Sequence, residues 1–261
     1  MSVPARETEK PRTRRVKRKN VQAGDGWTVV THASSGEGVA LDGVRARGTV
    51  QGLTVEMLMH DLRQRRERWR DTECARGLEG AMGQRSWDVG EAVCIGIGSF
   101  SLDWEHRHRA MWQLVMLLEV IRFISKPELT IKVYAQEPAF TPLDLDFLAA
   151  LDIEVTISHI EIHITDKTFV FAPFVDWYIL LPTFLRDKEP ELYIGNEILD
   201  EYDIYASSED KKVVLAESNA VGQKLLKGRQ SRRVPEFALH AHALNGLVTY
   251  WKIDRDADIP H

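Results

Sequence analysis

The sequence predicts an α/β protein in which a mainly parallel sheet is flanked by helices. Between residues 91 and 196, short β-prone runs alternate with segments whose apolar residues recur at helical spacing. Such alternation is typical of parallel strands joined by helical crossovers. With 261 residues and a hydrophobic content of 44%, the chain suffices for one sizeable core. We therefore expect one domain over residues 25–255, centred on residues 90–205 and preceded by a disordered basic arm.

The arm differs from the rest of the chain in charge. Residues 1–19 hold eight Lys and Arg residues against Glu7 and Glu9, a formal charge of +6, which leaves −11 for the remainder of a chain at −5. With so few apolar residues, residues 1–24 cannot bury enough surface to offset the entropy of ordering. The basic run from Arg14 to Lys19 is a nuclear-import signal, a contact for RNA or an acidic partner, or a solubilising arm. The acidic remainder argues against a broad nucleic-acid interface.

Cysteine usage and hydropathy exclude several classes of protein. Cys74 and Cys94 are separated by 19 intervening residues, and Cys94 lies within an apolar run, so neither a disulfide framework nor a zinc site is expected. The N-terminal residues contain no apolar segment of signal-peptide length, and no unbroken apolar run is long enough to span a membrane. We expect an intracellular protein of the cytoplasm or nucleus, without a membrane partner.

The first elements lead up to the centre of the domain. Residues 24–31 combine a turn with a β-prone run, and residues 34–52 are glycine-rich and predicted to form a loop. Thr54 is an N-cap candidate for a helix that continues through the charged residues 63–70.

A glycine-containing turn follows the first central strand. The apolar run from residue 91 ends in Gly96-Ile97-Gly98-Ser99, and a long amphipathic segment comes after it. Where a strand turns sharply into a helix, the exposed backbone amides can hold an anion or a nucleotide. Gly96 and Gly98 match the first two glycines of Gly-x-Gly-x-x-Gly, but Ser101 occupies the third position. The glycines either form a ligand loop or simply permit a turn and close helix packing.

Polar residues around this turn limit its ligands. Ser99 and Ser101 can donate hydroxyl groups to a phosphate or carboxylate, whereas Asp103 and Glu105 would repel one.

The remaining elements follow in order. Asp103 is expected to cap a helix over residues 106–123, and Pro182 to kink or break a helix over residues 177–186. Further strands are expected at residues 130–134, 154–157, 168–171, 191–194, 232–237 and 246–251, further helices at 143–151 and 216–226, and a loop at 202–212.

Two other candidate binding residues lie at strand ends. Glu137 comes 39 residues after Gly98, later than the ribose-binding acid of a dinucleotide fold at about 20 residues, but still at the end of the next strand. That position is compatible with an adenosyl site of the methyltransferase type. Asn196 either caps a helix at Glu197 or lines the crevice. A nucleotide or S-adenosylmethionine is therefore the cofactor class to consider.

The histidines form no metal or catalytic pattern. His106 and His108, interleaved with Arg107 and Arg109, form either a polar helix face or a contact for an anionic ligand. The other sequence-adjacent pairs are interpreted as structural, namely His159 with His163 and His240 with His242. No bound metal is expected.

Several of these motifs together resemble one family. They are Asp25-Gly26-Trp27-Thr28-Val29-Val30, Cys94-x-Gly96-x-Gly98-Ser99-Phe100-Ser101, Gln113-Leu114, Tyr134-x-Gln136-Glu137-Pro138-x-Phe140-Thr141, Phe171-x-Pro173 and Tyr193-Ile194-Gly195-Asn196. In this order, over residues 25–205, they resemble the Sensitivity-to-Red-light-Reduced (SRR-like) family. The resemblance implies a Rossmann-like α/β domain with a regulatory role, notably in light and circadian-clock input in plants. Other members are linked to haem metabolism or cytoskeletal phenotypes, and no established reaction comes with the family.

The chain departs from the family pattern at two points. The usual Pro-His-Cys is replaced by Pro173-Phe174-Val175, and Glu137 stands where aspartate is more usual. If the imidazole and thiol bind metal or react in relatives, this chain cannot do so there. If they only pack, Phe174 and Val175 are acceptable replacements.

Together with the role that the resemblance implies, these observations favour a regulatory protein and leave an enzyme as the alternative. It would act through a protein partner and a small ligand at the glycine turn, with binding residues at Gly96, Gly98, Ser99, Ser101, Glu137 and Asn196. The alternatives are a transferase dependent on S-adenosylmethionine or a nucleotide, and an interaction scaffold whose basic arm sets its location.

Overall fold

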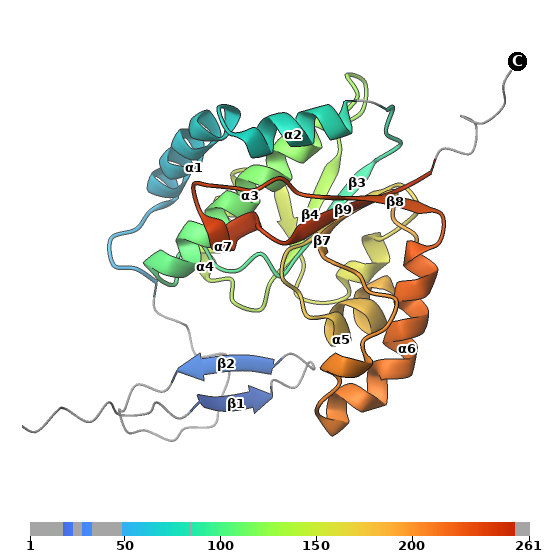
Figure 1. Ribbon diagram of the computed structural model, residues 1–261. Coiled ribbons are helices and arrows are strands. Elements are labelled where there is room, and N and C mark those ends of the chain that lie inside the picture. Colours follow the sequence, from blue (N-terminus) through green and yellow to red (C-terminus); the bar gives the residue numbers. More distant parts are fainter. Residues whose placement is uncertain (1–17, 23–27, 33–48, 84, 254–261) are drawn as a thin grey trace, which may run out of the picture. The chain divides into compact units, whose positions relative to one another are not determined.

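The computed structural model describes residues 18–22, 28–32, 49–83 and 85–253 (Figure 1). Strands β1 (Arg18–Gln22) and β2 (Thr28–His32) pair antiparallel with each other and belong to a body separate from the larger sheet. The predicted β-prone run therefore covers β2 except for its last residue. The predicted basic arm contains β1 and otherwise lies outside the described residues, as does most of the predicted loop at residues 34–52.

The larger body is built on a sheet of seven strands in the order β5-β4-β3-β6-β7-β9-β8. The strands are β3 (Glu91–Ile95), β4 (Lys132–Gln136), β5 (Ile153–Val155), β6 (Thr168–Ala172), β7 (Leu192–Asn196), β8 (Arg229–Arg233) and β9 (Leu247–Lys252). From β5 to β7 all neighbours are parallel, and β9 is antiparallel to both of its neighbours. This confirms the predicted mainly parallel sheet.

The path of the chain fixes where a ligand crevice belongs. The chain enters the sheet at the inner strand β3, builds β4 and β5 on one side, and then crosses to β6 and β7 on the other. In an open α/β sheet, the crevice lies outside the carboxyl ends of the two strands where the direction of winding reverses. Here those strands are β3 and β6.

Helices cover the sheet in two groups (Figure 1). One group contains α1 (Val55–Arg70), α2 (Glu73–Met82), α3 (Trp104–Ile124), α4 (Pro142–Ala149) and α7 (Ala241–Leu244), and the other contains α5 (Trp177–Ile179) and α6 (Glu209–Leu226). Their apolar sides and the sheet form the core, in which Trp69 and Trp112 lie 5.5 Å and 5.0 Å from the ring of Phe237.

Side-chain caps start the helices where the sequence predicts them. The Met57 amide donates to Oγ1 of Thr54 at 3.3 Å, and the His106 amide donates to Oδ1 of Asp103 at 2.9 Å. Each bond satisfies one of the amides that a first helical turn leaves without a helical partner. Both predicted N-caps are confirmed.

Three helical segments differ from the sequence prediction. Helix α2 is absent from it, although Thr72 caps the helix and Cys74, Leu78 and Met82 recur at four-residue spacing. Helix α6 begins at Glu209 rather than at residue 216, and two acidic residues in its first turn complement the helix dipole. The four-residue helix α7 is too short to give a periodic signal.

Pro182 breaks its helix in a particular way. Helix α5 gives way to π-helical turns over Leu180–Leu185, which contain this proline. Because proline has no backbone N–H to donate to the residue four positions earlier, the α-helical pattern cannot continue through it.

Within the described ranges, no helix combines the length and apolar character that crossing a membrane requires.

Candidate functional site

The sequence-predicted site residues lie at the carboxyl edge of the parallel strands. The turn at residues 96–101 follows β3, Glu137 follows β4, and Asn196 ends β7. The structure brings Glu137 onto the turn itself. Asn196 lies two strands away in the sheet order, beyond β6.

The carboxylate of Glu137 joins two adjacent strand ends. The backbone amide of Gly98 donates to its Oε2 at 2.9 Å, and the amide of Ala139 donates to its Oε1 at 2.9 Å. Gly98 has a φ of +83°, a left-handed conformation that glycine adopts without strain and that turns this amide out of the strand direction. The amide that would face an anion in a nucleotide loop is thus bonded to an acidic side chain.

Ser99 and Ser101 are bonded to the start of helix α4. Ser99 Oγ donates to Asp144 Oδ2 at 2.6 Å, and Ser101 Oγ shares a 2.6 Å hydrogen bond with Thr141 Oγ1. The Phe100 amide donates to Asp144 Oδ1 at 3.1 Å. All five side chains are buried. The two serine hydroxyls therefore have partners inside the protein.

Thr141 and Asp144 are functional neighbours that the sequence analysis missed. They form a capping box on α4, in which each side chain bonds the backbone amide of the other. The Thr-x-x-Asp spacing ahead of Phe147 and Leu148 is a readable sign of such a box. Its contact with Ser99 was not readable, because it joins residues 45 positions apart.

Val175 occupies the crevice between the ends of β3 and β6. Gly96 has a φ of +73°, and a Cβ at this position would lie only 2.7 Å from Cγ2 of Val175. The Asn196 side-chain amide donates to the carbonyl of Val175 at 3.0 Å. Three strand ends are thus joined through one residue, which stands where the family pattern has cysteine.

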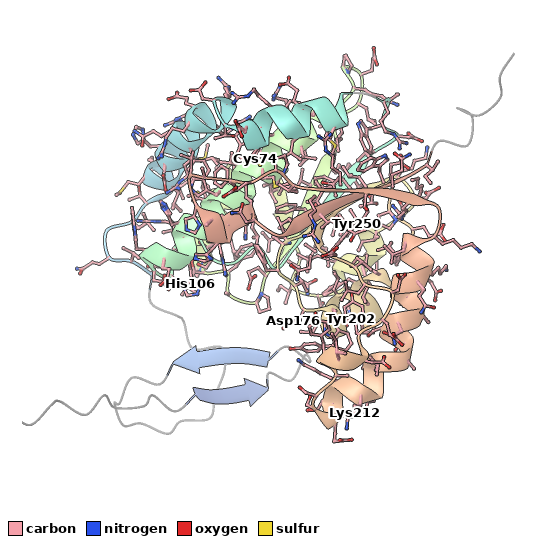
Figure 2. The ribbon with its side chains drawn as sticks, in the orientation of Figure 1. Cys74, His106, Asp176, Tyr202, Lys212 and Tyr250 are labelled. Atoms are coloured by element: carbon pink, nitrogen blue, oxygen red, sulfur yellow. The ribbon has the colours of Figure 1, made fainter. Side chains whose placement is uncertain are left out.

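A pocket of about 160 Å³ lies beside this junction, at the ends of β6 and β7. It is lined by Val175, Asp176, Trp177, Leu180, Asn196, Glu197, Ile198, Leu199, Tyr202 and Tyr205. Figure 2 labels Asp176 and Tyr202, which come from the segments after β6 and β7 respectively. Of the predicted binding residues, Asn196 is the one in this lining.

The wall of the pocket is aromatic and its polar atoms are few. The rings of Trp177 and Tyr202 stack with centroids 4.7 Å apart and an interplanar angle of 17°. The Tyr202 hydroxyl accepts a hydrogen bond from the Leu199 amide at 3.0 Å, and burial raises the pKa of Tyr202 to about 12. The phenol is therefore neutral at physiological pH and acts as a hydrogen-bonding group, not as a charge.

The rim of the pocket is acidic, and a strained residue precedes its first lining residue in the chain. Asp176 accepts a hydrogen bond from the Tyr178 hydroxyl at 3.0 Å, and Glu197 pairs with Arg233 at 2.7 Å. Phe174, next to the pocket, has a φ of +58° and is 37% exposed. A bulky residue in this conformation costs energy, and such residues cluster at ligand sites.

Both cysteines have unreactive surroundings. They are free thiols and fully buried, and burial raises the pKa of Cys74 to about 12 and that of Cys94 higher still. Since the thiolate is the reactive form, we predict that iodoacetamide at pH 8 labels neither thiol in the native protein. Mass spectrometry before and after denaturation in guanidinium checks this, and rapid labelling of the native protein at either position would contradict it.

The histidines lie in several unrelated environments. His106 pairs with Asp103 at 2.6 Å on the surface, and His163 stacks on Tyr134 with centroids 3.7 Å apart. His108 and His240, which the sequence analysis did not connect, lie with ring centroids 5.0 Å apart. In the part of the chain that the structure describes, no group of three or more His, Cys, Asp or Glu is placed to hold a metal ion.

Comparisons with known proteins address the fold and the family. Among solved structures, the Bacillus cereus O-methyltransferase in complex with SAH is similar over 75% of this chain and 90% of its own, with 12% identity and a TM-score of 0.41. Cofactor-bound Rv0187 from MTB is similar over 75% of this chain and 89% of its own, with 11% identity and a TM-score of 0.38. These likenesses concern fold alone. No curated protein matches the chain.

The family of this chain is assigned by a match over most of its sequence. The model of the SRR1 domain matches residues 63–251, which is most of the chain and includes the glycine turn, Glu137, Val175 and Asn196. This chain therefore belongs to the SRR1 domain family.

Proposed function

We propose that this protein is a regulatory binding protein, which takes a small ligand in the pocket at the ends of β6 and β7 and acts through a protein partner. Light or circadian-clock input is the pathway that the SRR-like resemblance supports. The observation that carries the proposal is the closure of the cofactor crevice by the protein's own groups. The basic run from Arg14 to Lys19 remains a prediction for nuclear import, for RNA or acidic-partner contact, or for solubility.

The closure has two parts. Gly98 and Phe100 donate their amides to Glu137 and Asp144, so these donors are not directed at a phosphate. The Val175 side chain packs over Gly96, where the crevice of a doubly wound sheet would open. The fully buried Phe100 reinforces the turn by packing on the rings of Phe140 and Phe147, at 6.1 Å and 5.2 Å between centroids.

The pocket itself indicates the class of ligand. A cavity of about 150 Å³ accepts a benzene-sized group, and this pocket has a volume of about 160 Å³. The Trp177 and Tyr202 rings offer stacking, while Asp176 and Glu197 at the rim favour a positive charge. The ligand class that fits is a single aromatic ring carrying an amine.

Benzylamine tests this assignment by calorimetric titration of the full chain. A fragment of this size is expected to bind with a Kd of about 1 mM, and benzoate, of matched size and opposite charge, at least about tenfold more weakly. Leu199→Trp fills the pocket and should abolish binding, whereas Val213→Trp, on an exposed position of α6, should leave it unchanged. Equal benzylamine binding by the two variants would show that the ligand does not bind in this pocket.

A transferase dependent on S-adenosylmethionine is the second candidate. Glu137 favours it, because a carboxylate at the end of the strand next to the glycine turn suits the ribose hydroxyls of an adenosyl group. The acidic side chains near the turn disfavour phosphates more than they disfavour S-adenosylmethionine, which has no phosphate and carries a sulfonium cation.

Calorimetry with S-adenosylmethionine separates the two functions. A transferase gives saturable heat that is lost in Glu137→Gln and kept in Glu154→Gln, a matched change at an exposed residue of β5. The regulatory proposal predicts no saturable heat with the wild-type chain. Saturable binding of S-adenosylmethionine that is lost in Glu137→Gln and kept in Glu154→Gln would overturn the regulatory proposal.

A further inference from the structure

Arginine and histidine side chains from three distant segments meet on the face covered by α1, α3 and α7, which Figure 1 shows as one group. Arg65 on α1 contacts Nδ1 of His108 on α3 through its Nη2 at 2.9 Å. The ring of His108 lies 5.0 Å from that of His240, which precedes α7. We call these three residues, with Arg68, the Arg–His cluster. None of them belongs to the pocket at the ends of β6 and β7.

Arg65 is a buried cation whose hydrogen-bonding capacity is not exhausted. It is 4% exposed, and its Nε and Nη2 donate to Asp61 at 2.8 Å and 3.3 Å. Its Nη1 is buried without a hydrogen-bond partner, and the same holds for Nδ1 of His240. Leaving such donors unsatisfied inside a protein costs free energy unless a ligand or water bonds to them.

The Trp112 ring contacts the guanidinium groups of two arginines. The guanidinium carbons of Arg65 and Arg68 lie 5.0 Å and 5.6 Å from its centroid. Beside them is a hollow of about 360 Å³ lined by Asp61, Gln64, Arg65, Glu67 and Arg68. The ring limits the freedom of both arginines, so little further entropy is lost when they bind the same group.

We propose that the Arg–His cluster binds the phosphate group of a small ligand. Paired guanidinium groups match the oxygens of a phosphate, and the imidazole N–H groups add donors beside them. The carboxylates of Asp61 and Glu67 restrict the positive charge to a small area. One phosphate fits such an area, whereas nucleic acid requires an extended row of cations.

Inorganic phosphate and sulfate are the probes for this site, titrated calorimetrically into the full chain at constant ionic strength. Both should bind with saturation, and acetate should bind at least about fivefold more weakly because a carboxylate carries one charge. Arg68→Gln should weaken phosphate binding about tenfold, whereas Arg63→Gln, the same change at an exposed position of α1, should leave it within about twofold. The absence of saturable binding, equal losses in both variants, or acetate binding as tight as phosphate would each overturn the proposal.

The pH dependence of sulfate binding gives an independent readout, because sulfate keeps its charge between pH 5 and 8. Burial lowers the pKa of His240, whose Nδ1 has no hydrogen-bond partner, and a bound dianion would raise it again. His108 adds no such gain, because its Nδ1 accepts from the Arg65 guanidinium and protonation would break that bond. The charged and titratable groups facing the two rings are Asp61, Arg65, Arg68, Arg109 and His242. Sulfate affinity should therefore increase from pH 7.5 to 5.5, and a flat profile would contradict a role for His240.

Discussion

Replacing Asp144 by alanine should lower the free energy of unfolding by about 4 kcal/mol. The Asp144 carboxylate is buried and accepts from the Ser99 hydroxyl and from the amides of Phe100 and Thr141. Alanine leaves these three donors inside the protein without an acceptor, and each such loss costs about 1–3 kcal/mol.

Urea denaturation followed by circular dichroism measures this effect. Asp146→Ala, at an exposed position of the same helix, is the matched control and should change the free energy of unfolding by less than about 0.5 kcal/mol. Similar small effects of both substitutions would show that the turn does not depend on the capping box of α4.

Replacing Gly96 by alanine should destabilise the protein by about 3 kcal/mol, partly through its left-handed backbone and partly through a clash. Gly96 has a φ of +73°, and the added Cβ would approach Cγ2 of Val175 to 2.7 Å. Gly96 is half-buried, but Val175 is buried, so relieving the contact requires a packed side chain to shift.

Gly52 provides a matched control for the backbone contribution. Its φ is +76°, and no heavy atom lies within 4 Å of a Cβ added there. Gly52→Ala should therefore cost about 1 kcal/mol, the price of the left-handed conformation alone. The same urea titration measures both variants. Equal losses of unfolding free energy at the two glycines would contradict a destabilising contact between the new Cβ and Val175.

Local sequence was enough to predict the strands and helices and to place the motifs at the carboxyl edge of the parallel strands. The apolar run before Gly96, the N-caps at Thr54 and Asp103, and the alternation of strands and helices each depend on residues close together in the chain. The order of the last strands was not predictable, because β9 inserts between β7 and β8 and pairs antiparallel with both.

The sequence could not show which side chains contact one another at the carboxyl edge of the sheet. Ser99, Ser101 and Glu137 are predicted ligand-binding groups because each residue type can bond a cofactor. In the structure they bond Asp144, Thr141 and the Gly98 amide. These partners lie 39 to 45 residues away, and no local pattern specifies such contacts.

The Arg–His cluster illustrates the same limit. In the sequence, Arg65 is one of the charged residues of a predicted helix, and His240 is paired only with His242 and interpreted as structural. Packing of α1 and α7 on α3 brings them to His108, 43 residues from Arg65 in the chain.

The departure from the family pattern at Val175 gains a physical meaning from its contacts. A valine packed over Gly96 and held by Asn196 fills the crevice with an apolar side chain that has no chemistry. These contacts give Val175 a packing role in this chain.

A double-mutant cycle between Gly96→Ala and Val175→Ala tests the closed crevice most directly. If Val175 fills the space next to Gly96, removing its side-chain methyl groups makes room for the new Cβ. The double variant should then be about 1–2 kcal/mol more stable than the sum of the single effects predicts. Additivity within about 0.5 kcal/mol would contradict the closed crevice and, with it, the main argument for a regulatory binding protein over a cofactor-dependent enzyme.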